Sequence, residues 1–172
     1  GINLEDIKAP ESFEIERRLV EELNIPVMHD DQHGTAIISS AALLNAVELA
    51  GKKMEEVKMV ISGAGSAAIA CANLYVSFGV KPENVVMFNS KGALRKDDPR
   101  VTDMQRRYAT DKHYDDLAHA MKGADVFIGL SSGDIVTPEM LLSMADNPIV
   151  FAMANPTPEI NYNLAIDTRK DI

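Results

Sequence analysis

The sequence is poor in cysteine, in aromatic residues and in positive charge, and each shortage excludes a class of protein. Its single cysteine, Cys71, rules out an internal disulfide framework and a zinc site built on several cysteines. No apolar run approaches the ~20 residues that cross a bilayer. Lys and Arg number 17 against 26 Asp and Glu, a formal net charge of −9, which disfavours partners that need a broad basic surface, such as nucleic acid or an anionic membrane.

What remains is an ordinary globular composition. The 172 residues suffice for one compact domain, with 46% apolar and 25% charged residues. The first residues do not resemble a signal peptide, so we interpret the protein as soluble and cytoplasmic. An anionic small molecule stays possible as a ligand, because it needs only a local cradle.

Short β-rich runs alternate with helical stretches, which predicts an α/β fold with a Rossmann-like, doubly wound and mostly parallel sheet. We expect strands at 57–62, 84–88, 125–130 and 149–153, after a short extended run at 26–28. We expect helices at 11–23, 35–49, from the glycine turn to 78, at 103–122 with a break near Lys112, and at 138–144. Both ends look cut, and the alternation calls for another strand after Ile172, so we expect a piece of a larger polypeptide.

A glycine-rich turn between a strand and an Ala-rich helix carries the strongest functional signal. Its sequence is Gly63-Ala64-Gly65-Ser66-Ala67-Ala68, the dinucleotide-binding pattern G-x-G-x-x-G/A in its required context. Gly63 permits the tight turn, Gly65 lets a pyrophosphate approach the backbone, and Ala68 lets the helix pack closely. The helix N-terminus then faces the phosphates. A turn of small residues without a ligand is the alternative.

The end of the next strand distinguishes NAD from NADP. An acidic residue there would bind the ribose 2′-hydroxyl and repel a 2′-phosphate. This sequence has Asn89 instead, followed by Ser90 and Lys91, with Arg95 and Lys96 nearby. The pattern favours NADP, with NAD possible, although such a charged loop can also be merely solvated.

Two acidic pairs are the other candidate site, Glu5-Asp6 and Asp30-Asp31. Three oxygen ligands suit a hard cation such as Mg²⁺ or Mn²⁺ better than zinc. Taken alone the signal is weak, because adjacent acids are more often helix caps or solvated loops.

Two histidines, His29 and His33, flank the second acidic pair. We expect residues 30–32 to form a loop, so a shared helical face is doubtful, and we assign both histidines packing or hydrogen-bonding roles. Cys71 is interpreted as a small core residue.

Several segments together resemble the bacterial malic enzyme family. They are 1–10, 25–36 with the specific string His-Asp-Asp-Gln-His-Gly-Thr-Ala, 63–65, 124–129 and 151–160 with Phe-Ala-Met-Ala-Asn-Pro-Thr-Pro-Glu-Ile. The resemblance runs essentially from end to end. The tail at 161–165 is most similar to the large form that is fused to a phosphotransacetylase-like domain.

The resemblance implies a role for the acidic residues. It places the divalent cation, Mg²⁺ or Mn²⁺, on Glu5, Asp6 and Asp31. Asp30, beside the last of these, would orient groups near the substrate.

The resemblance also implies cofactor contacts outside the glycine turn. Thr35 opens a helix that approaches the cofactor, and the amide of Asn155 falls near the nicotinamide and the substrate. Ser131, within Leu130-Ser131-Ser132, lines the adenosine side.

The implied reaction is oxidative decarboxylation of L-malate to pyruvate and CO₂ with NADP reduction, by a homo-oligomer. In the family, the lysine base and the tyrosine acid lie upstream of Gly1, and an Asn-rich substrate loop lies beyond Ile172. We therefore expect 1–172 to be one dinucleotide-binding domain, with the metal-ligand segments at 1–34 and the Rossmann-like core at 35–172, and with a substrate domain and a C-terminal remainder absent. Alone, it should bind dinucleotide weakly and not turn over malate.

Two alternatives stay open. A nucleotide-binding regulatory module would share the glycine turn but would have no use for three converging acids. A malolactic-type enzyme would share the scaffold and release lactate.

Overall fold

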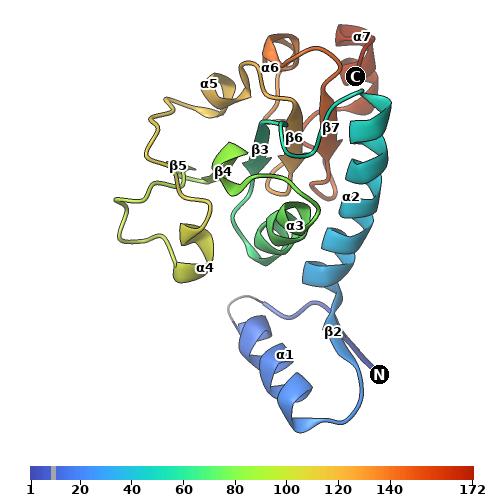
Figure 1. Cartoon of the computed structure of the whole chain (residues 1–172), viewed down its shortest axis with the longest axis vertical. Helices are drawn as coiled ribbons and strands as arrows, with labels where there is room; N and C mark the ends of the chain where they lie inside the picture. Colours follow the sequence, from blue (N-terminus) through green and yellow to red (C-terminus); the bar gives the residue numbers. More distant parts are fainter. Residues whose placement is uncertain (9–10) are drawn as a thin grey trace.

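A computed structural model describes residues 1–8 and 11–172 of the chain. Figure 1 shows a small N-terminal lobe beside a larger sheet with helices around it. The strands are β1 (Ile2–Leu4), β2 (Val27–His29), β3 (Met59–Ser62), β4 (Val85–Asn89), β5 (Gly92–Ala93), β6 (Val126–Gly129) and β7 (Ile149–Ala152). The helices are α1 (Glu11–Glu22), α2 (Asp30–Leu49), α3 (Ser66–Ser77), the 3₁₀ turn η1 (Pro82–Asn84), α4 (Asp103–Arg106), α5 (Leu117–Met121), α6 (Pro138–Ser143) and α7 (Tyr162–Thr168).

The larger sheet has the strand order β5-β4-β3-β6-β7. Strands β4, β3, β6 and β7 are parallel, and only the two-residue β5 is antiparallel. Within this sheet the chain forms β3 first, places β4 beside one edge of β3, and then crosses back to place β6 beside the other edge. In parallel α/β sheets, ligands bind outside the carboxyl ends of the strands at this switch point.

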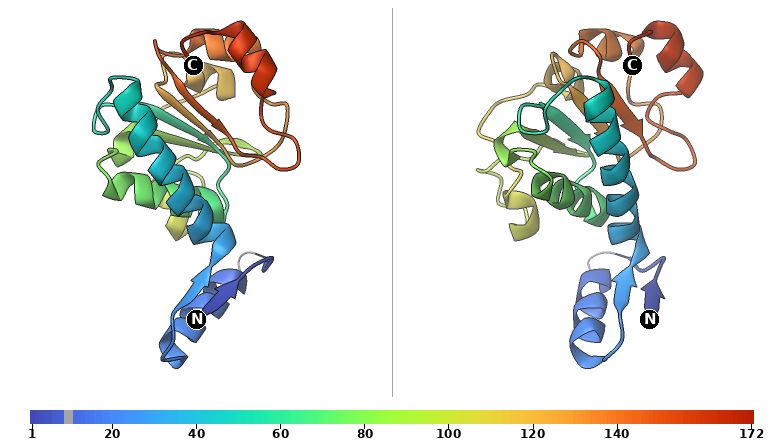
Figure 2. Two further views of the ribbon diagram at one scale, coloured as in Figure 1. Left: turned by 90° about the vertical axis from the view of Figure 1, so that its right-hand side faces the viewer. Right: turned by 45° about the vertical axis from the view of Figure 1, so that its right-hand side comes forward.

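The two faces of the sheet carry separate hydrophobic cores, because successive side chains of a strand point to opposite faces. In β3, Met59 and Ile61 belong to the core under α2 and α3, and Val60 belongs to the core under α5, α6 and α7. Figure 2 shows helices on both sides of the sheet. The predicted doubly wound, mostly parallel α/β fold is confirmed.

The N-terminal lobe contains a strand that the sequence analysis did not anticipate. Strand β1 pairs in parallel with β2, with Leu4 opposite His29, and the amide of Ile2 donates to the carbonyl of Pro26 at 2.8 Å. Ile2 and Leu4 are half-buried as a result. Three residues are too short a run to show strand periodicity.

Helix α2 begins at Asp30, five residues before the expected start, so the predicted loop at 30–32 is wrong. His29 is its extended N-cap residue, and Asp30 and Asp31 lie in its first turn. Carboxylates in that position are stabilised by the positive end of the helix dipole. Gly34 lies inside the helix, where its helix-breaking tendency is overridden by the turns on either side.

The segment 103–122 was expected to be helical with a break near Lys112, and the structure confirms this break, which is wider than expected and leaves two short helices, α4 and α5. Between them the backbone amide of Thr110 donates to the carbonyl of Leu94 at 2.8 Å, which pulls the segment toward the loop after β5. Asp116 caps α5 by accepting from the amide of His119 at 2.7 Å. Helix α7, N-capped by Asn161, was not predicted.

Within the described residues, no helix is both long enough and apolar enough to span a membrane.

Candidate functional site

A cavity of about 400 Å³ opens at the carboxyl ends of β3, β4 and β6, the switch point of the sheet. It is lined by Ser62, Gly63, Ala64, Gly65, Phe88, Asn89, Ser90, Gln105, Leu117, Ser131, Ser132 and Ile135. The structure thus brings together most of the residues predicted to hold the cofactor. Those that do not line the cavity are Ser66, Ala67, Ala68, Lys91 and Asn155.

The glycine turn forms the floor of this cavity. Gly63 has φ +123°, a conformation that favours glycine, and an added Cβ would lie 2.5 Å from the carbonyl oxygen of Leu130. Gly65 is extended and immediately precedes α3, and an added Cβ would meet nothing within 4 Å. Gly63 is therefore required by the protein itself, whereas Gly65 borders open space at a helix N-terminus. That cradle fits a phosphate group.

The helix that leaves the turn is held close to the sheet. Ser66 is the first residue of α3, and Ala68 is only 1% exposed within the core beneath α2 and α3. The small side chain of Ala68 allows this close packing, as predicted for the third position of the pattern.

Two hydrogen bonds fix the walls. The hydroxyl groups of Ser62 and Ser131 are 2.8 Å apart, and Gln105 donates from Nε2 to the carbonyl of Ala64 at 2.9 Å. The sequence analysis missed Gln105. The only signal was local: Gln105 and Thr102 form a capping box at the start of α4, which predicts a helix end but not its contact with the glycine turn.

The loop after β4 has less free positive charge than its sequence indicates. Arg95 is paired with Asp97 at 2.9 Å and Lys96 with Asp111 at 2.6 Å. The hydrogen bond from Arg95 lowers the pKa of Asp97 below its usual value. Lys91 is exposed, and within the described part of the chain its ammonium group has no ion-pair partner. Lys91 is therefore the cation of this loop that stays available to a ligand.

The backbone of the same loop is ordered by Asn89. Its side-chain oxygen accepts a hydrogen bond from the amide of Lys91 at 2.8 Å, a local turn that fixes where Lys91 leaves the strand. Asn89 thus has a structural role besides its place in the cavity wall.

The acidic pairs lie at the ends of the neighbouring strands β1 and β2. The amide of Asp6 donates to Oδ2 of Asp31 at 2.9 Å, and Asp6 has φ +56°. Glu5 is exposed. Among residues 1–8 and 11–172, no three His, Cys, Asp or Glu side chains are arranged to hold a metal ion. The carboxylate oxygens suit a hard cation chemically. Among the three predicted ligands, the one hydrogen bond within the described residues is that from the backbone amide of Asp6 to the carboxylate of Asp31.

Two neighbours of Asp31 shape this region. The ring of His29 is 1% exposed, forms no hydrogen bond within the described structure, and has Nε2 3.7 Å from Oδ2 of Asp31. The side chain of Asp30 folds back over Gly34, where a Cβ would overlap it.

Glu16 joins the two parts of this lobe. Its Oε1 accepts from the amide of His29 at 2.9 Å, and its Oε2 lies 3.1 Å from Nε2 of His33. The hydrogen-bonding role predicted for His33 is confirmed. Glu16 was missed because it lies on a helix whose other acidic residues face solvent.

None of the predicted metal ligands lines the cavity at the glycine turn. Asn155 is exposed in the loop after β7, and Thr35 is half-buried in the second turn of α2 rather than at the start of the helix. The structure therefore assembles the dinucleotide cradle locally and leaves the acids in the adjoining lobe.

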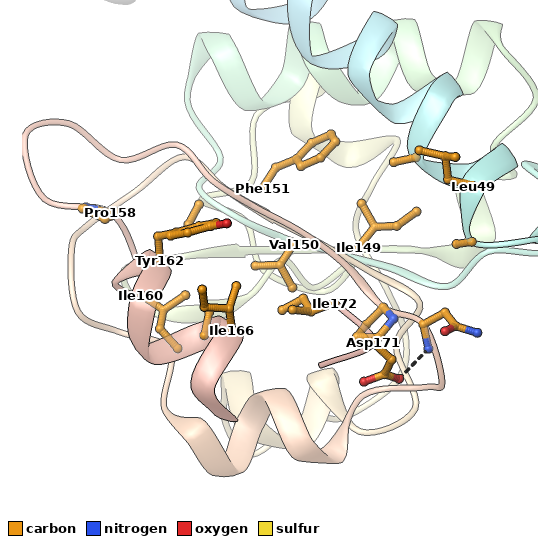
Figure 3. A pocket seen from close by; sticks show the side chains of 16 residues that line it. Leu49, Ile149, Val150, Phe151, Pro158, Ile160, Tyr162, Ile166, Asp171 and Ile172 are labelled. Atoms are coloured by element: carbon orange, nitrogen blue, oxygen red, sulfur yellow. Dashed lines mark hydrogen bonds between the residues drawn. The ribbon is translucent and has the colours of Figure 1, made fainter. Parts of the chain in front are cut away.

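A second, larger cavity of about 700 Å³ lies along β7, between the end of α2 and α7. Figure 3 shows its apolar walls, with Ile149, Phe151 and Ile166 among the labelled side chains, and the hydrogen bond from the amide of Asn147 to Asp171 at 2.9 Å. None of the predicted site residues lines this cavity, and we assign it no chemistry.

Comparison with known proteins gives consistent matches. A family model described as "Malic enzyme, NAD binding domain" matches residues 32–165. An NADP-dependent malic enzyme of Halomonas elongata is 53% identical over 172 residues, covering 100% of this chain and 41% of the relative. An NAD-dependent malic enzyme of Rhizobium meliloti is 52% identical over 172 residues, covering 99% of this chain and 22% of the relative.

A solved structure agrees. The NAD-dependent malic enzyme of Thermotoga maritima is 46% identical and superposes with a TM-score of 0.90, over 98% of this chain and 46% of that one. The chain thus spans less than half the length of each of these proteins. Because they include NAD- and NADP-dependent enzymes, similarity alone does not select the cofactor.

Proposed function

Because this chain belongs to the malic enzyme family, as its NAD-binding domain, we propose that it is the dinucleotide-binding part of an enzyme that oxidatively decarboxylates L-malate to pyruvate and CO₂. The family resemblance inferred from the sequence is confirmed by these comparisons. The observation that supports the proposal best is the open cradle at Gly65, at the switch point of the sheet. The chain spans 41% and 22% of two of the relatives it matches, so the activity of the whole enzyme is part of this proposal.

We propose NADP as the preferred cofactor. Strand β4 ends at Asn89, an amide in place of a carboxylate, and Lys91 lies two residues further on with no ion-pair partner within the described residues. A ribose 2′-phosphate beside this loop gains a charge-assisted hydrogen bond that a 2′-hydroxyl cannot form.

The chain's residues have separate tasks in this proposal. The glycine turn and the N-terminus of α3 bind the pyrophosphate, Ser131 borders the adenosine, and Asn155 borders the nicotinamide. The reaction removes the proton of the C2 hydroxyl to a base and transfers a hydride from C2 of malate to the nicotinamide. It then breaks the C3–C4 bond to release CO₂, and the resulting enolate takes up one proton at C3.

We further propose that Glu5, Asp6 and Asp31 hold a divalent cation, Mg²⁺ or Mn²⁺, with Asp30 orienting groups beside it. The support is the pairing of β1 with β2, which brings the two acidic ends together, and the hydrogen bond between Asp6 and Asp31. When bound, such a cation supplies Lewis-acid stabilisation of negative charge on the C2 oxygen. Binding requires the carboxylates of all three residues to turn toward one point, because within the described residues they do not yet form a metal-binding group.

Calorimetric titration of the 172-residue chain with NADP and with NAD, separately, tests the proposal. We expect weak binding of both, tighter for NADP, and no reduction of NADP in the presence of malate and Mg²⁺. Absence of binding to either dinucleotide contradicts the proposed function. Tighter binding of NAD contradicts only the proposed preference for NADP. Malate-dependent formation of NADPH contradicts only the proposal that this chain binds the dinucleotide without turning over malate.

A further inference from the structure

A buried carboxylate lies behind the cofactor cavity. Glu159 is 0% exposed, and both of its oxygens accept hydrogen bonds from backbone amides. Oε1 accepts from Ser131 at 3.0 Å and Oε2 from Ala154 at 3.1 Å. Two acceptors and no donor is the hydrogen-bonding pattern of an ionised carboxylate. Burying such a group is costly unless it is fully hydrogen-bonded, so its position calls for an explanation.

The surrounding backbone is shaped to receive this carboxylate. Gly129 ends β6, and a Cβ added there would overlap the carboxyl group of Glu159. The main chain of Glu159 is fixed as well, because its carbonyl accepts from the amide of Val136 at 2.9 Å. The missing side chain of Gly129 therefore leaves the space that the carboxyl group of Glu159 fills.

The two amides belong to two different loops. Ser131 follows β6 and its hydroxyl contacts that of Ser62 in the cavity wall, and Ala154 follows β7 and directly precedes Asn155. These loops carry the adenosine-side and nicotinamide-side residues of the proposed cofactor site. One carboxylate thus ties together the loops at both ends of a bound dinucleotide.

We propose that Glu159 is a positioning residue that sets the distance between the loop after β6 and the loop after β7, so that both fit one extended dinucleotide. The proposal rests on the proposed function, since it assumes that these loops border the cofactor. Glu159 acts through Ser131 and Ala154 and does not itself touch the cofactor, because it does not line the cavity.

The conservative variant Glu159→Gln separates this role from simple packing. Glutamine fills the same volume but replaces one carboxylate oxygen with an NH₂ group. That NH₂ group would face the backbone N–H of Ser131 or of Ala154, and because both groups are donors no hydrogen bond can form. One of the two loops must then lose its hydrogen bond and shift. A hydrogen bond to a charged group contributes enough that we expect dinucleotide binding to weaken about tenfold.

The test measures the dissociation constant of NADPH and its fluorescence when bound, for the 172-residue chain, together with the melting temperature. Leu141→Ala is the stability control, because Leu141 is 0% exposed on α6 and does not line the cofactor cavity. We expect both variants to melt earlier. Only Glu159→Gln should weaken NADPH binding and change the emission of the bound nicotinamide, measured well below both melting temperatures.

Each outcome decides the proposal. If Glu159→Gln binds NADPH as tightly as the wild type, or if Leu141→Ala weakens binding equally, Glu159 is a packing residue and the proposal is wrong. If Glu159→Gln does not fold, Glu159→Asp replaces it, because it keeps both acceptors and shortens their reach; unchanged affinity there also overturns the proposal. If the wild-type chain binds no dinucleotide, the proposed function fails instead.

Discussion

The hydroxyl groups of Ser62 and Ser131 lie 2.8 Å apart, which joins the last residue of β3 to the loop after β6. These two strands are neighbours in the sheet although 63 residues separate their ends at Ser62 and Val126 in the sequence. The contact closes one side of the cavity at the glycine turn. The cavity wall is therefore preformed by the protein and does not depend on a ligand to bring the two strand ends together.

The two glycines of the turn should respond differently to alanine. Gly65→Ala should leave the melting temperature almost unchanged, because its Cβ would meet no protein atom within 4 Å and its φ is ordinary. It should nevertheless weaken NADP binding about tenfold or more, since the methyl group occupies the space of the pyrophosphate. Thermal melting and calorimetry measure both effects.

Gly63→Ala provides the contrast. At φ +123° and with the carbonyl of Leu130 at 2.5 Å, the added Cβ should lower stability by about 1–3 kcal/mol. Equal melting temperatures for the two variants, or unchanged NADP binding by Gly65→Ala, would contradict this division.

Reversing the charge at Lys91 should weaken NADP selectively. In Lys91→Glu the new carboxylate repels the 2′-phosphate, so we expect roughly a tenfold loss for NADP and little change for NAD. Lys53→Glu makes the same charge change at an exposed lysine outside the cavity and serves as the control. An equal loss for both dinucleotides would remove Lys91 from the 2′-phosphate site.

Asp31→Asn should weaken binding of Mn²⁺ about tenfold or more, because it removes one charged oxygen from the proposed ligand set. Electron paramagnetic resonance of free Mn²⁺ measures this in the intact protein. Glu55→Gln, at an exposed carboxylate remote from β1 and β2, controls for nonspecific attraction by the chain's negative charge. Unchanged Mn²⁺ affinity in Asp31→Asn would exclude Asp31 as a ligand.

The ion pair between Lys52 and Asp125 should matter for stability. Their side chains are only 16% and 18% exposed, at 2.7 Å, and Asp125 also accepts from the amide of Lys58 at 2.8 Å. Asp125→Asn should lower the free energy of unfolding by about 1–2 kcal/mol, because it weakens the anchor at the start of β6. Urea titration measures this change.

The surface pair of Arg95 with Asp97 is the matched control for that measurement. Asp97 is 71% exposed, so Asp97→Asn should change the free energy of unfolding by less than about 0.5 kcal/mol. If both variants lose the same stability, burial is not what gives the Lys52–Asp125 pair its effect.

The buried thiol of Cys71 should make the protein less stable at alkaline pH. Cys71 is 0% exposed, and burial raises the pKa of its thiol above the ordinary value of 9.0. The unfolded chain ionises this thiol above pH 9.0, whereas the folded chain keeps it protonated, so the stabilisation is present below pH 9.0 and is lost as the pH rises.

Comparing the free energy of unfolding at pH 8 and at pH 10 checks this prediction. The decline should be smaller in Cys71→Ala than in the wild type. Burial and the neighbouring Cys71 both raise the pKa of Tyr75, so replacing Cys71 also reduces the part of the decline that comes from Tyr75. Identical pH dependence in the two would show that Cys71 does not contribute.

Much of the fold was predictable because it depends on local periodicity. The buried strands at β3, β4, β6 and β7 are short apolar runs bounded by turns, and all four were expected. The start of helix α2 was predicted five residues too late, because Gly34 and two adjacent aspartates are typical of a loop. Only the structure shows that the aspartates lie in the first turn of the helix, where the helix dipole stabilises them. The break between α4 and α5 was expected near Lys112, but its width was not, because the contact of Thr110 with Leu94 is absent from any local pattern.

The sequence by itself determined the glycine turn, because the requirement for small residues at Gly63, Gly65 and Ala68 is a property of one strand–turn–helix unit. Only the tertiary structure decided which other groups meet that turn. Gln105 reaches it from a distant segment, and the carboxylate of Glu159 joins the loops after β6 and β7 beside it. The pairing of β1 with β2 likewise brings the amide of Asp6 to Asp31. The physical reason is that a hydrogen bond between segments far apart in the chain depends on how the strands are ordered in the sheet, and this order is set by packing of the whole core.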